Sequence, residues 1–150
     1  MRLTRYSDYA MRVLIHLATR SDGICSISDI AKAHGVSQNH LMKVVHDLGK
    51  AGYIASSRGR KGGVKLAVAA SDINVGTLLR RTEDGFNLVD CPSCILSGGC
   101  GLSSALDEAM AAFLGVLDKY TLADLVDRHR SMLRVLLSSA ERPSVKTSLA

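Results

Sequence analysis

The 150-residue sequence predicts a mainly α-helical fold with one small β-hairpin. Three observations support this prediction. Apolar residues recur every three or four positions through much of the chain, as they do on the buried face of a helix. Two short apolar segments flank a glycine-rich stretch, which is typical of a hairpin. The chain is 47% apolar and 22% charged, with a mean hydropathy of +0.13, and this composition suits a folded protein with a real core.

Three helices are expected within the first 50 residues. The first begins at about Ser7, a candidate N-cap, and ends at Thr19, and Ser28 is the candidate N-cap of the second. Gly35 follows the second helix, where a left-handed conformation would end it. Ser37 then caps the third helix, whose apolar residues share one face: Leu41, Val44, Val45 and Leu48.

A hairpin is expected after the third helix. Its strands are predicted at residues 53–55 and 64–67, and residues 56–63 form a basic, glycine-rich tip. A hairpin directly after a helix-turn-helix makes the predicted unit a winged helix. Asn74 is the candidate N-cap of a fourth helix.

A long amphipathic helix is predicted over residues 102–119, where apolar residues follow the i, i+3, i+4, i+7 pattern. One small subunit would not cover the whole apolar stripe, so we expect it to form a dimer contact. The residues of this stripe are Leu106, Met110, Phe113 and Leu117. Thr121 and Asp124 resemble a capping box that begins a last helix.

The expected organisation therefore has four parts. They are a winged helix-turn-helix domain over residues 1–83, a cysteine loop over 84–101, a dimerisation helix and C-terminal helix over 102–139, and a disordered tail over 140–150.

The charge of the chain is unevenly distributed. The first 65 residues carry 11 Lys and Arg against 4 Asp and Glu, a net charge of +7, whereas the remaining 85 carry 8 against 10. A basic first half favours a polyanion partner. The N-terminus has no signal-peptide pattern, and no uncharged stretch is apolar enough to span a membrane. We therefore expect a cytoplasmic protein whose thiols stay reduced.

The third helix and the hairpin tip are the candidate DNA-binding elements. The apolar face of the third helix holds it on the core, so its polar residues point outward to base edges and phosphates. The candidates are Ser37, Gln38, Asn39, His40 and Lys43. The tip offers Arg58, Arg60 and Lys61 for phosphates or the minor groove. Helix-turn-helix, basic tip and charge together predict that the partner is double-stranded DNA.

Three cysteines lie close together before the long helix. Cys91, Cys94 and Cys100 form a C-x2-C-x5-C pattern in a loop rich in Gly, Pro and Ser. Clustered thiolates bind iron–sulfur clusters, zinc or copper(I). Two alternatives remain open: unligated structural thiols, and a thiol–disulfide oxidoreductase motif in Cys91-Pro92-Ser93-Cys94. Cys25, far from the others, is expected to be a small buried apolar residue.

Several segments in order resemble the bacterial iron–sulfur winged-helix regulators of the IscR/NsrR family. They are residues 1–4, 8–10, 39–45, 58–63, 82–83, the three-cysteine loop and residues 120–125. The stretches Asn39–Val45 and Tyr120–Leu125 look most like the NsrR branch, the nitric-oxide-sensitive repressors. The resemblance covers roughly residues 1–126.

The resemblance implies a homodimer in which long helices cross and each subunit holds one iron–sulfur cluster. The family's three cysteines correspond to Cys91, Cys94 and Cys100, and Asp8 of the other subunit corresponds to a fourth ligand found in some NsrR-type members. Ser103 stands where IscR-type members have a ligating His. The cluster is expected to be 4Fe–4S rather than 2Fe–2S, although the gap between the first two cysteines is shorter than usual.

The function we expect is a dimeric DNA-binding repressor, not an enzyme, whose iron–sulfur cluster senses nitric oxide. Damage to the cluster would cause the repressor to release its DNA operator. One alternative within the family is a regulator that responds to iron supply or cluster status. The alternative from another class is a C-P-S-C thiol–disulfide oxidoreductase.

Overall fold

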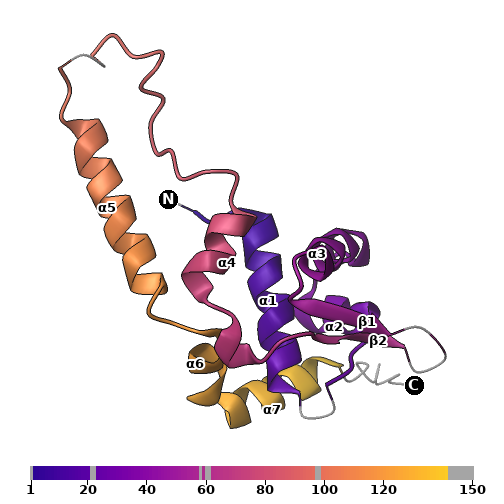
Figure 1. Ribbon diagram of the computed structural model, residues 1–150. Helices are drawn as coiled ribbons and strands as arrows, with labels where there is room; N and C mark the ends of the chain where they lie inside the picture. Colours follow the sequence, from indigo (N-terminus) through magenta and orange to yellow (C-terminus); the bar gives the residue numbers. More distant parts are fainter. Residues whose placement is uncertain (1, 21–22, 58, 60–61, 97–98, 142–150) are drawn as a thin grey trace, which may run out of the picture.

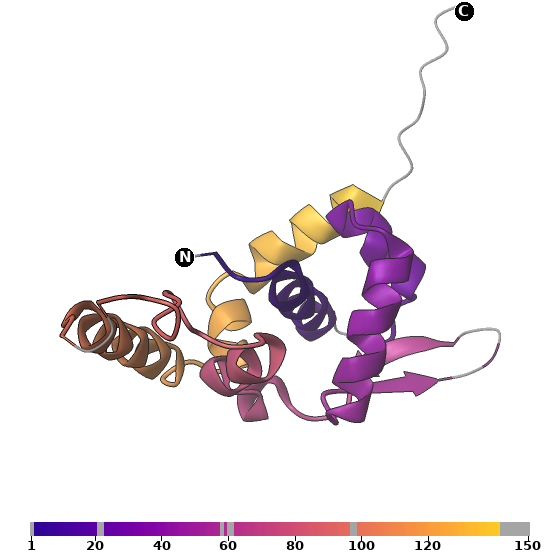
Figure 2. The ribbon, with the colours of Figure 1, turned by 90° about the horizontal axis from the view of Figure 1, so that it is seen from above.

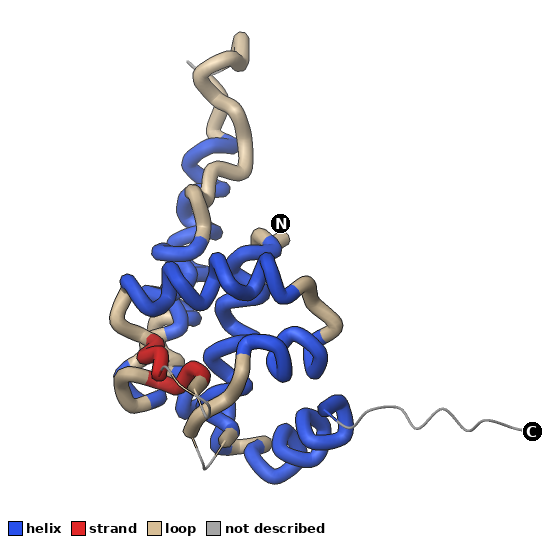
Figure 3. Tube along the Cα trace, turned by 90° about the vertical axis from the view of Figure 1, so that its right-hand side faces the viewer, coloured by secondary structure: helices blue, strands red, loops and turns tan. Residues whose placement is uncertain are grey.

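The computed structural model describes residues 2–20, 23–57, 59, 62–96 and 99–141. A globular body holds most of the helices and the hairpin, while α5 (Leu102–Leu117) and the loop before it project from that body (Figures 1 and 3). None of the described helices has the length and apolar character that a membrane span requires. The mainly α-helical class with one small hairpin is confirmed.

Helix α1 (Arg5–Thr19) lies at the centre of the body. It contacts α2 (Ile27–His34), α3 (Gln38–Lys50), α4 (Val75–Thr82) and α6 (Leu122–Asp127). Together these elements bury one continuous core that includes Leu14, Ile30, Leu41, Leu48, Ile73, Leu78 and Leu122. The apolar face predicted for the third helix is buried as expected, since Leu41, Val44, Val45 and Leu48 all belong to this core.

The hairpin consists of two antiparallel strands. β1 (Ile54–Ser57) pairs with β2 (Gly63–Leu66), in a register from Ile54 opposite Leu66 to Ser57 opposite Gly63. Both strands lie within one or two residues of their predicted bounds. Figure 2 shows the hairpin on the opposite side of the body from α5.

Two predicted helix starts were wrong. The side chain of Thr4, not Ser7, caps α1 by accepting from the backbone N–H of Ser7 at 3.2 Å. The side chain of Ser26, not Ser28, caps α2 by accepting from the N–H of Asp29 at 3.0 Å. In each case a second suitable residue stands a few positions earlier. Ser7 is fully buried and bonds to another helix, a role that only the tertiary packing determines.

The other helix ends follow the predictions more closely. Gly35 adopts the left-handed conformation, with φ +61°, and ends α2. Ser37 precedes α3 but makes no capping hydrogen bond with its side chain. The N-cap at Asn74 is confirmed, with its side chain accepting from Thr77 N–H at 2.9 Å. A 3-10 turn, η1 (Ala70–Asp72), connects the hairpin to α4.

The predicted last helix is two helices. The capping box of Thr121 and Asp124 is present and begins α6, but α6 ends at Asp127 and α7 runs over Arg130–Glu141. Arg130 and Arg134 of α7 donate hydrogen bonds to the backbone oxygens of Ala18 and Thr19, at the end of α1. These contacts fix α7 on α1, and no periodicity in the sequence indicates them. Of the predicted tail, residues 142–150 lie outside the described residues.

Candidate nucleic-acid interface and cysteine loop

The helix-turn-helix is formed by α2, the turn at Gly35 and Val36, and α3. The N–H of Val36 donates to the oxygen of Ala31 at 2.9 Å, which closes the turn. With its apolar face buried, α3 exposes the predicted DNA-binding residues Ser37, Gln38, Asn39, His40 and Lys43. We call α3 the recognition helix, because it presents this polar face to solvent beside the turn.

The hairpin is fixed to the segment before α2. Cys25 and Val64 form an antiparallel bridge in which each N–H donates to the other's oxygen, at 3.0 and 2.8 Å. Gly63 allows this close approach, since a Cβ there would lie 2.6 Å from the Cys25 oxygen. The hairpin, which is the wing of the winged helix, is thus positioned by contact with the segment that leads into the helix-turn-helix. The predicted tip residues Arg58, Arg60 and Lys61 lie outside the described residues.

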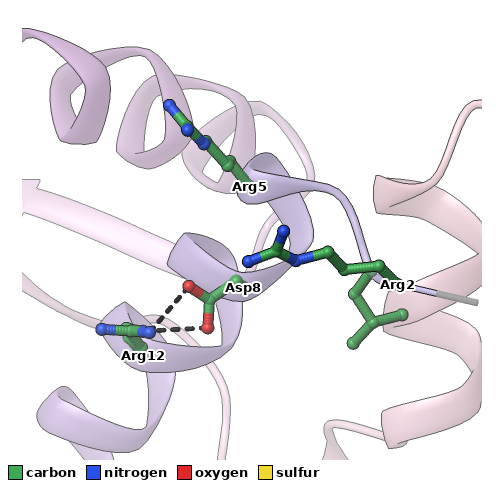
Figure 4. Close-up of a pocket in the computed structure, with 5 residues that line it drawn as sticks. Arg2, Arg5, Asp8 and Arg12 are labelled. Atoms are coloured by element: carbon green, nitrogen blue, oxygen red, sulfur yellow. Dashed lines mark hydrogen bonds and ion pairs between the residues drawn. The ribbon is translucent and has the colours of Figure 1, made fainter.

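Asp8 lies in the first turn of α1, in a hollow of about 520 Å³ that is lined by Arg2, Leu3, Arg5 and Arg12 as well. Its carboxylate pairs with Arg12 at 2.9 Å, and both side chains are partly exposed. Figure 4 shows the Arg2 guanidinium directed toward Asp8 and the Arg5 side chain directed away from it. The hollow is therefore electropositive and suits an anionic group.

Two contacts join the start of α1 to the end of α4. The backbone N–H and hydroxyl of Thr4 donate to Glu83 Oε1 at 2.9 and 3.1 Å. The Ser7 hydroxyl donates to the Thr82 hydroxyl at 2.7 Å in a buried position. Glu83 directly precedes the cysteine loop, so the turn that carries Asp8 is attached to the point from which that loop departs.

The cysteine loop has little regular structure. Cys91 is half-buried, Cys94 and Cys100 are exposed, and all three are free thiols. The N–H of Cys94 bonds to the oxygen of Cys91 at 3.1 Å, and that of Cys100 bonds to the oxygen of Leu96 at 3.0 Å. Cys91 shares a surface hollow with Ser103 at the start of α5.

The donor chemistry of this loop fits an iron–sulfur cluster, because reduced, accessible thiols are what such a cluster requires. Within one protomer, however, no group of three or more described His, Cys, Asp or Glu residues is gathered closely enough to hold a metal ion. The structure therefore does not bring the predicted ligands Cys91, Cys94, Cys100 and Asp8 together in a single subunit.

The apolar stripe predicted on α5 is only partly covered. Met110 is buried, whereas Leu106, Phe113 and Leu117 are half-buried. On other sides of the helix Leu102 and Val116 remain 54% and 51% exposed. The described body contacts this helix mainly through α4.

The core contains a buried chain of three side chains that the sequence did not indicate. His16, fully buried on α1, lies with Nδ1 3.3 Å from His34 Nε2 and with Nε2 3.5 Å from Cys25 Sγ. Burial lowers the pKa of His34 below its ordinary value, Arg12 lowers it further, and Asp8 partly opposes them. The expectation that Cys25 is buried is confirmed. Residues distant in sequence meet here, and no local pattern marks them.

A family model described as "Iron-dependent Transcriptional regulator" matches residues 3–128. The chain belongs to the Rrf2 family. Its relatives include the HTH-type transcriptional regulators NsrR of Bacillus licheniformis and of Bacillus subtilis (strain 168). The first is 49% identical over 92% of this chain and 100% of the relative, and the second is 46% identical over 91% and 97%. The predicted resemblance to iron–sulfur winged-helix regulators is thereby confirmed.

Solved structures of this family have the same fold. The oxidised form of Staphylococcus aureus CymR has a TM-score of 0.70 at 30% identity, covering 83% of this chain and 95% of that one. T. potens IscR has a TM-score of 0.71 at 27% identity, covering 88% and 90%. As an Rrf2 member with NsrR relatives along most of its length, the chain is a transcriptional regulator with a winged helix-turn-helix fold.

Proposed function

We propose that this Rrf2 regulator is a homodimeric DNA-binding repressor with an iron–sulfur cluster that responds to nitric oxide. The observation that carries the proposal is the position of Asp8. Its helical turn is hydrogen-bonded to the residues before the cysteine loop, and its helix packs against the recognition helix. A ligand at this position connects the partner's cysteine loop to the DNA-binding elements of this subunit.

The ligands proposed for the cluster are Cys91, Cys94 and Cys100 of one subunit and Asp8 of the other. Exposure of Cys94 and Cys100 leaves them available for such an arrangement across a dimer. The arginine-rich surroundings of Asp8 favour an anionic thiolate-bound cluster. We propose a 4Fe–4S cluster, which when bound would supply iron that reacts with nitric oxide. Asp8 is a hard oxygen ligand, so it would bind the cluster more weakly than the three thiolates do.

Release of Asp8 offers a route to DNA release. The hydroxyl of Tyr6, in the same turn of α1, donates to Asp47 of the recognition helix at 3.2 Å. A movement of this turn would therefore move the recognition helix as well. A dimer must place two recognition helices about 34–36 Å apart, one turn of DNA, so a small rotation lowers operator affinity.

The dimer contact proposed is the apolar stripe Leu106, Met110, Phe113 and Leu117 on α5. The projecting position of this helix and its incomplete cover support a partner helix there. The DNA contacts proposed are the exposed residues of α3 and the hairpin tip. We also propose that the protein acts in the cytoplasm and has no enzymatic activity.

A second candidate within the family is a regulator of iron supply or cluster status, which the family's description as iron-dependent favours. The thiol–disulfide oxidoreductase is not favoured. Such motifs begin a helix in a strand–helix–strand layout. Cys91 begins no helix, and the described residues contain only the two-stranded antiparallel sheet.

The proposal is tested by purifying the protein without oxygen and measuring iron, acid-labile sulfide and the visible spectrum. We expect a coloured protein with bound iron and sulfide, and loss of most iron in Cys94→Ser and Cys100→Ser. Asp8→Ala should keep the fold but change the spectrum or the lifetime of the cluster in air.

Cys25→Ala is the matched control. Cys25 is buried and lies outside the cysteine loop, so this substitution should leave the iron content unchanged. A colourless wild-type protein with a redox-active pair of thiols would contradict the proposal. Equal loss of iron from the control and the loop variants would contradict the ligand assignment.

A further inference from the structure

A second hollow, of about 220 Å³, lies between α1 and the recognition helix. Tyr6, Tyr9 and Val44 line it with apolar surface, and three basic side chains line it as well: Arg5, His40 and Lys43. We call this hollow the α1–α3 groove. Two of its basic residues, His40 and Lys43, already belong to the proposed DNA-contacting face, while Arg5 comes from a different helix.

Arg5 is available to bind an external group. It is exposed, and its side chain makes no hydrogen bond or ion pair with any other described residue. Figure 4 shows it extending away from the Asp8–Arg12 pair. The carboxylate of Asp47, on α3, accepts a hydrogen bond from the Tyr6 hydroxyl and makes no ion pair with Arg5. Arg5 therefore contributes an uncompensated positive charge beside the recognition helix.

Duplex DNA matches the chemistry of this groove. Phosphates flank the base edges that a recognition helix contacts, and cations beside the helix fix its register on the duplex. An arginine can hold a phosphate through two parallel N–H bonds. The residues that line the groove are two tyrosines, a valine and the three basic residues, so its lining contains no acidic side chain.

We propose that Arg5 binds a DNA backbone phosphate beside the recognition helix, so that the DNA interface extends onto the first turn of α1. This inference rests on the proposed DNA-binding function and adds a contact outside the helix-turn-helix and the wing. Arg5 also lines the hollow that contains Asp8, three residues along the same helix. The DNA contact and the proposed cluster ligand thus share one helical turn.

The test compares Arg5→Ala with Arg128→Ala, which removes the same exposed charge from the end of α6, a helix well separated from α3 (Figures 1 and 2). Lys43→Ala serves as the variant of the recognition helix. Binding to an operator duplex and to a random-sequence duplex is measured at several salt concentrations, after the oligomeric state and helix content of each variant are checked.

We expect Arg5→Ala to weaken binding to both duplexes roughly tenfold. Because each subunit of a dimer loses one phosphate contact, the log–log salt slope should fall by about 1.8. Arg128→Ala should behave like the wild type, and Arg5→Lys should retain most of the slope.

An Arg5→Ala protein with wild-type affinity and slope would overturn the inference, as would a change in sequence preference with an unaltered slope. The proposed function would survive either result if Lys43→Ala still weakens operator binding. Failure of the wild-type protein to bind any duplex would instead overturn the proposed function itself.

Discussion

The hydroxyl of Ser7 donates a hydrogen bond of 2.7 Å to the hydroxyl of Thr82, and both side chains are buried. This bond joins the first turn of α1, which carries Asp8, to the last turn of α4, which leads into the cysteine loop. It is the buried part of the connection, within one subunit, between the turn that carries Asp8 and the start of that subunit's own cysteine loop, and Thr4 and Glu83 form the exposed part. In the proposed dimer, Asp8 and this loop belong to two different cluster sites, so the bond connects the two sites.

Removing the Ser7 hydroxyl should destabilise the protein. In Ser7→Ala the buried Thr82 hydroxyl keeps only a long contact, 3.4 Å, to the Leu79 oxygen. A buried hydroxyl without a good partner costs about 1–3 kcal/mol. Urea unfolding of Ser7→Ala, Thr82→Val and the double variant measures the coupling. We expect the double variant to lose clearly less free energy of unfolding than the sum of the losses in the two single variants. A loss equal to that sum would show that the bond contributes nothing to stability.

A second set of contacts joins the projecting helix α5 to the body. Arg80 pairs with Asp118, at the end of α5, through hydrogen bonds of 2.5 and 2.8 Å, and the Asn74 side chain donates to the Asp118 backbone oxygen at 2.7 Å. Gly76 lies directly beneath, where a Cβ would stand 2.0 Å from Asp118 Oδ1 and 3.0 Å from its backbone nitrogen. The direction in which α5 leaves the body therefore depends on a glycine at this position.

Gly76→Ala should therefore destabilise the protein by roughly 1–3 kcal/mol, because overpacking outweighs the gain in helix propensity. Gly49→Ala is the control. Gly49 is also helical, but a Cβ there would meet its nearest atom at an ordinary 3.7 Å. This control should be neutral or more stable by about 0.5–1 kcal/mol. Thermal unfolding of both variants measures these changes in stability. A Gly76→Ala protein more stable than the wild type would contradict the packing argument.

The stability of the metal-free protein should depend on pH through His34. Burial lowers the pKa of this half-buried side chain, so the unfolded chain binds its proton at a higher pH than the folded chain does. The contribution of neutral His34 to the free energy of unfolding is fully present above the pKa of the unfolded chain, about 6.5, and is lost as the pH falls below that value. We expect a lower urea midpoint at pH 5.5 than at pH 7.5.

His34→Gln keeps a hydrogen-bonding group beside His16 and removes the titration. Its urea midpoint should therefore fall less between the two pH values than that of the wild type. Equal falls in both proteins would assign the pH dependence to other groups.

Asn39 should contribute sequence specificity. It is exposed at the start of the recognition helix, where an amide can bond to the edge of adenine. Asn39→Ala should weaken binding to an operator selected from a random library by about 1–3 kcal/mol and relax the preference at one base pair. Binding to non-specific duplexes should be unchanged. An unaltered operator preference would place Asn39 outside the base contacts.

The sequence predicted those features that depend on local pattern. The buried face of α3, the left-handed Gly35 and the capping box of Thr121 and Asp124 each follow from residues a few positions apart, and all are present. The Asp8–Arg12 pair was not predicted, although its i, i+4 spacing is that of a helical ion pair.

Features that depend on tertiary contacts were missed or misplaced. Ser7 suits an N-cap by type, but its partner is Thr82, 75 positions away. The break between α6 and α7 accompanies arginine contacts with the end of α1. The His16, His34 and Cys25 chain joins three separate segments. No local periodicity encodes such pairings. The gathering of the cysteines with Asp8 remains a prediction, because it involves two subunits.

The most direct test of the proposed sensor is an anaerobic titration of the cluster-loaded protein with nitric oxide, following operator binding by fluorescence anisotropy and the cluster by its visible spectrum. We predict that the operator is released in step with the loss of the cluster spectrum, and that removing iron with a chelator releases it more slowly. Operator binding that persists after nitric oxide has bleached the cluster would contradict the account. Release by the chelator with no response to nitric oxide would contradict nitric-oxide sensing and favour the iron-responsive regulator.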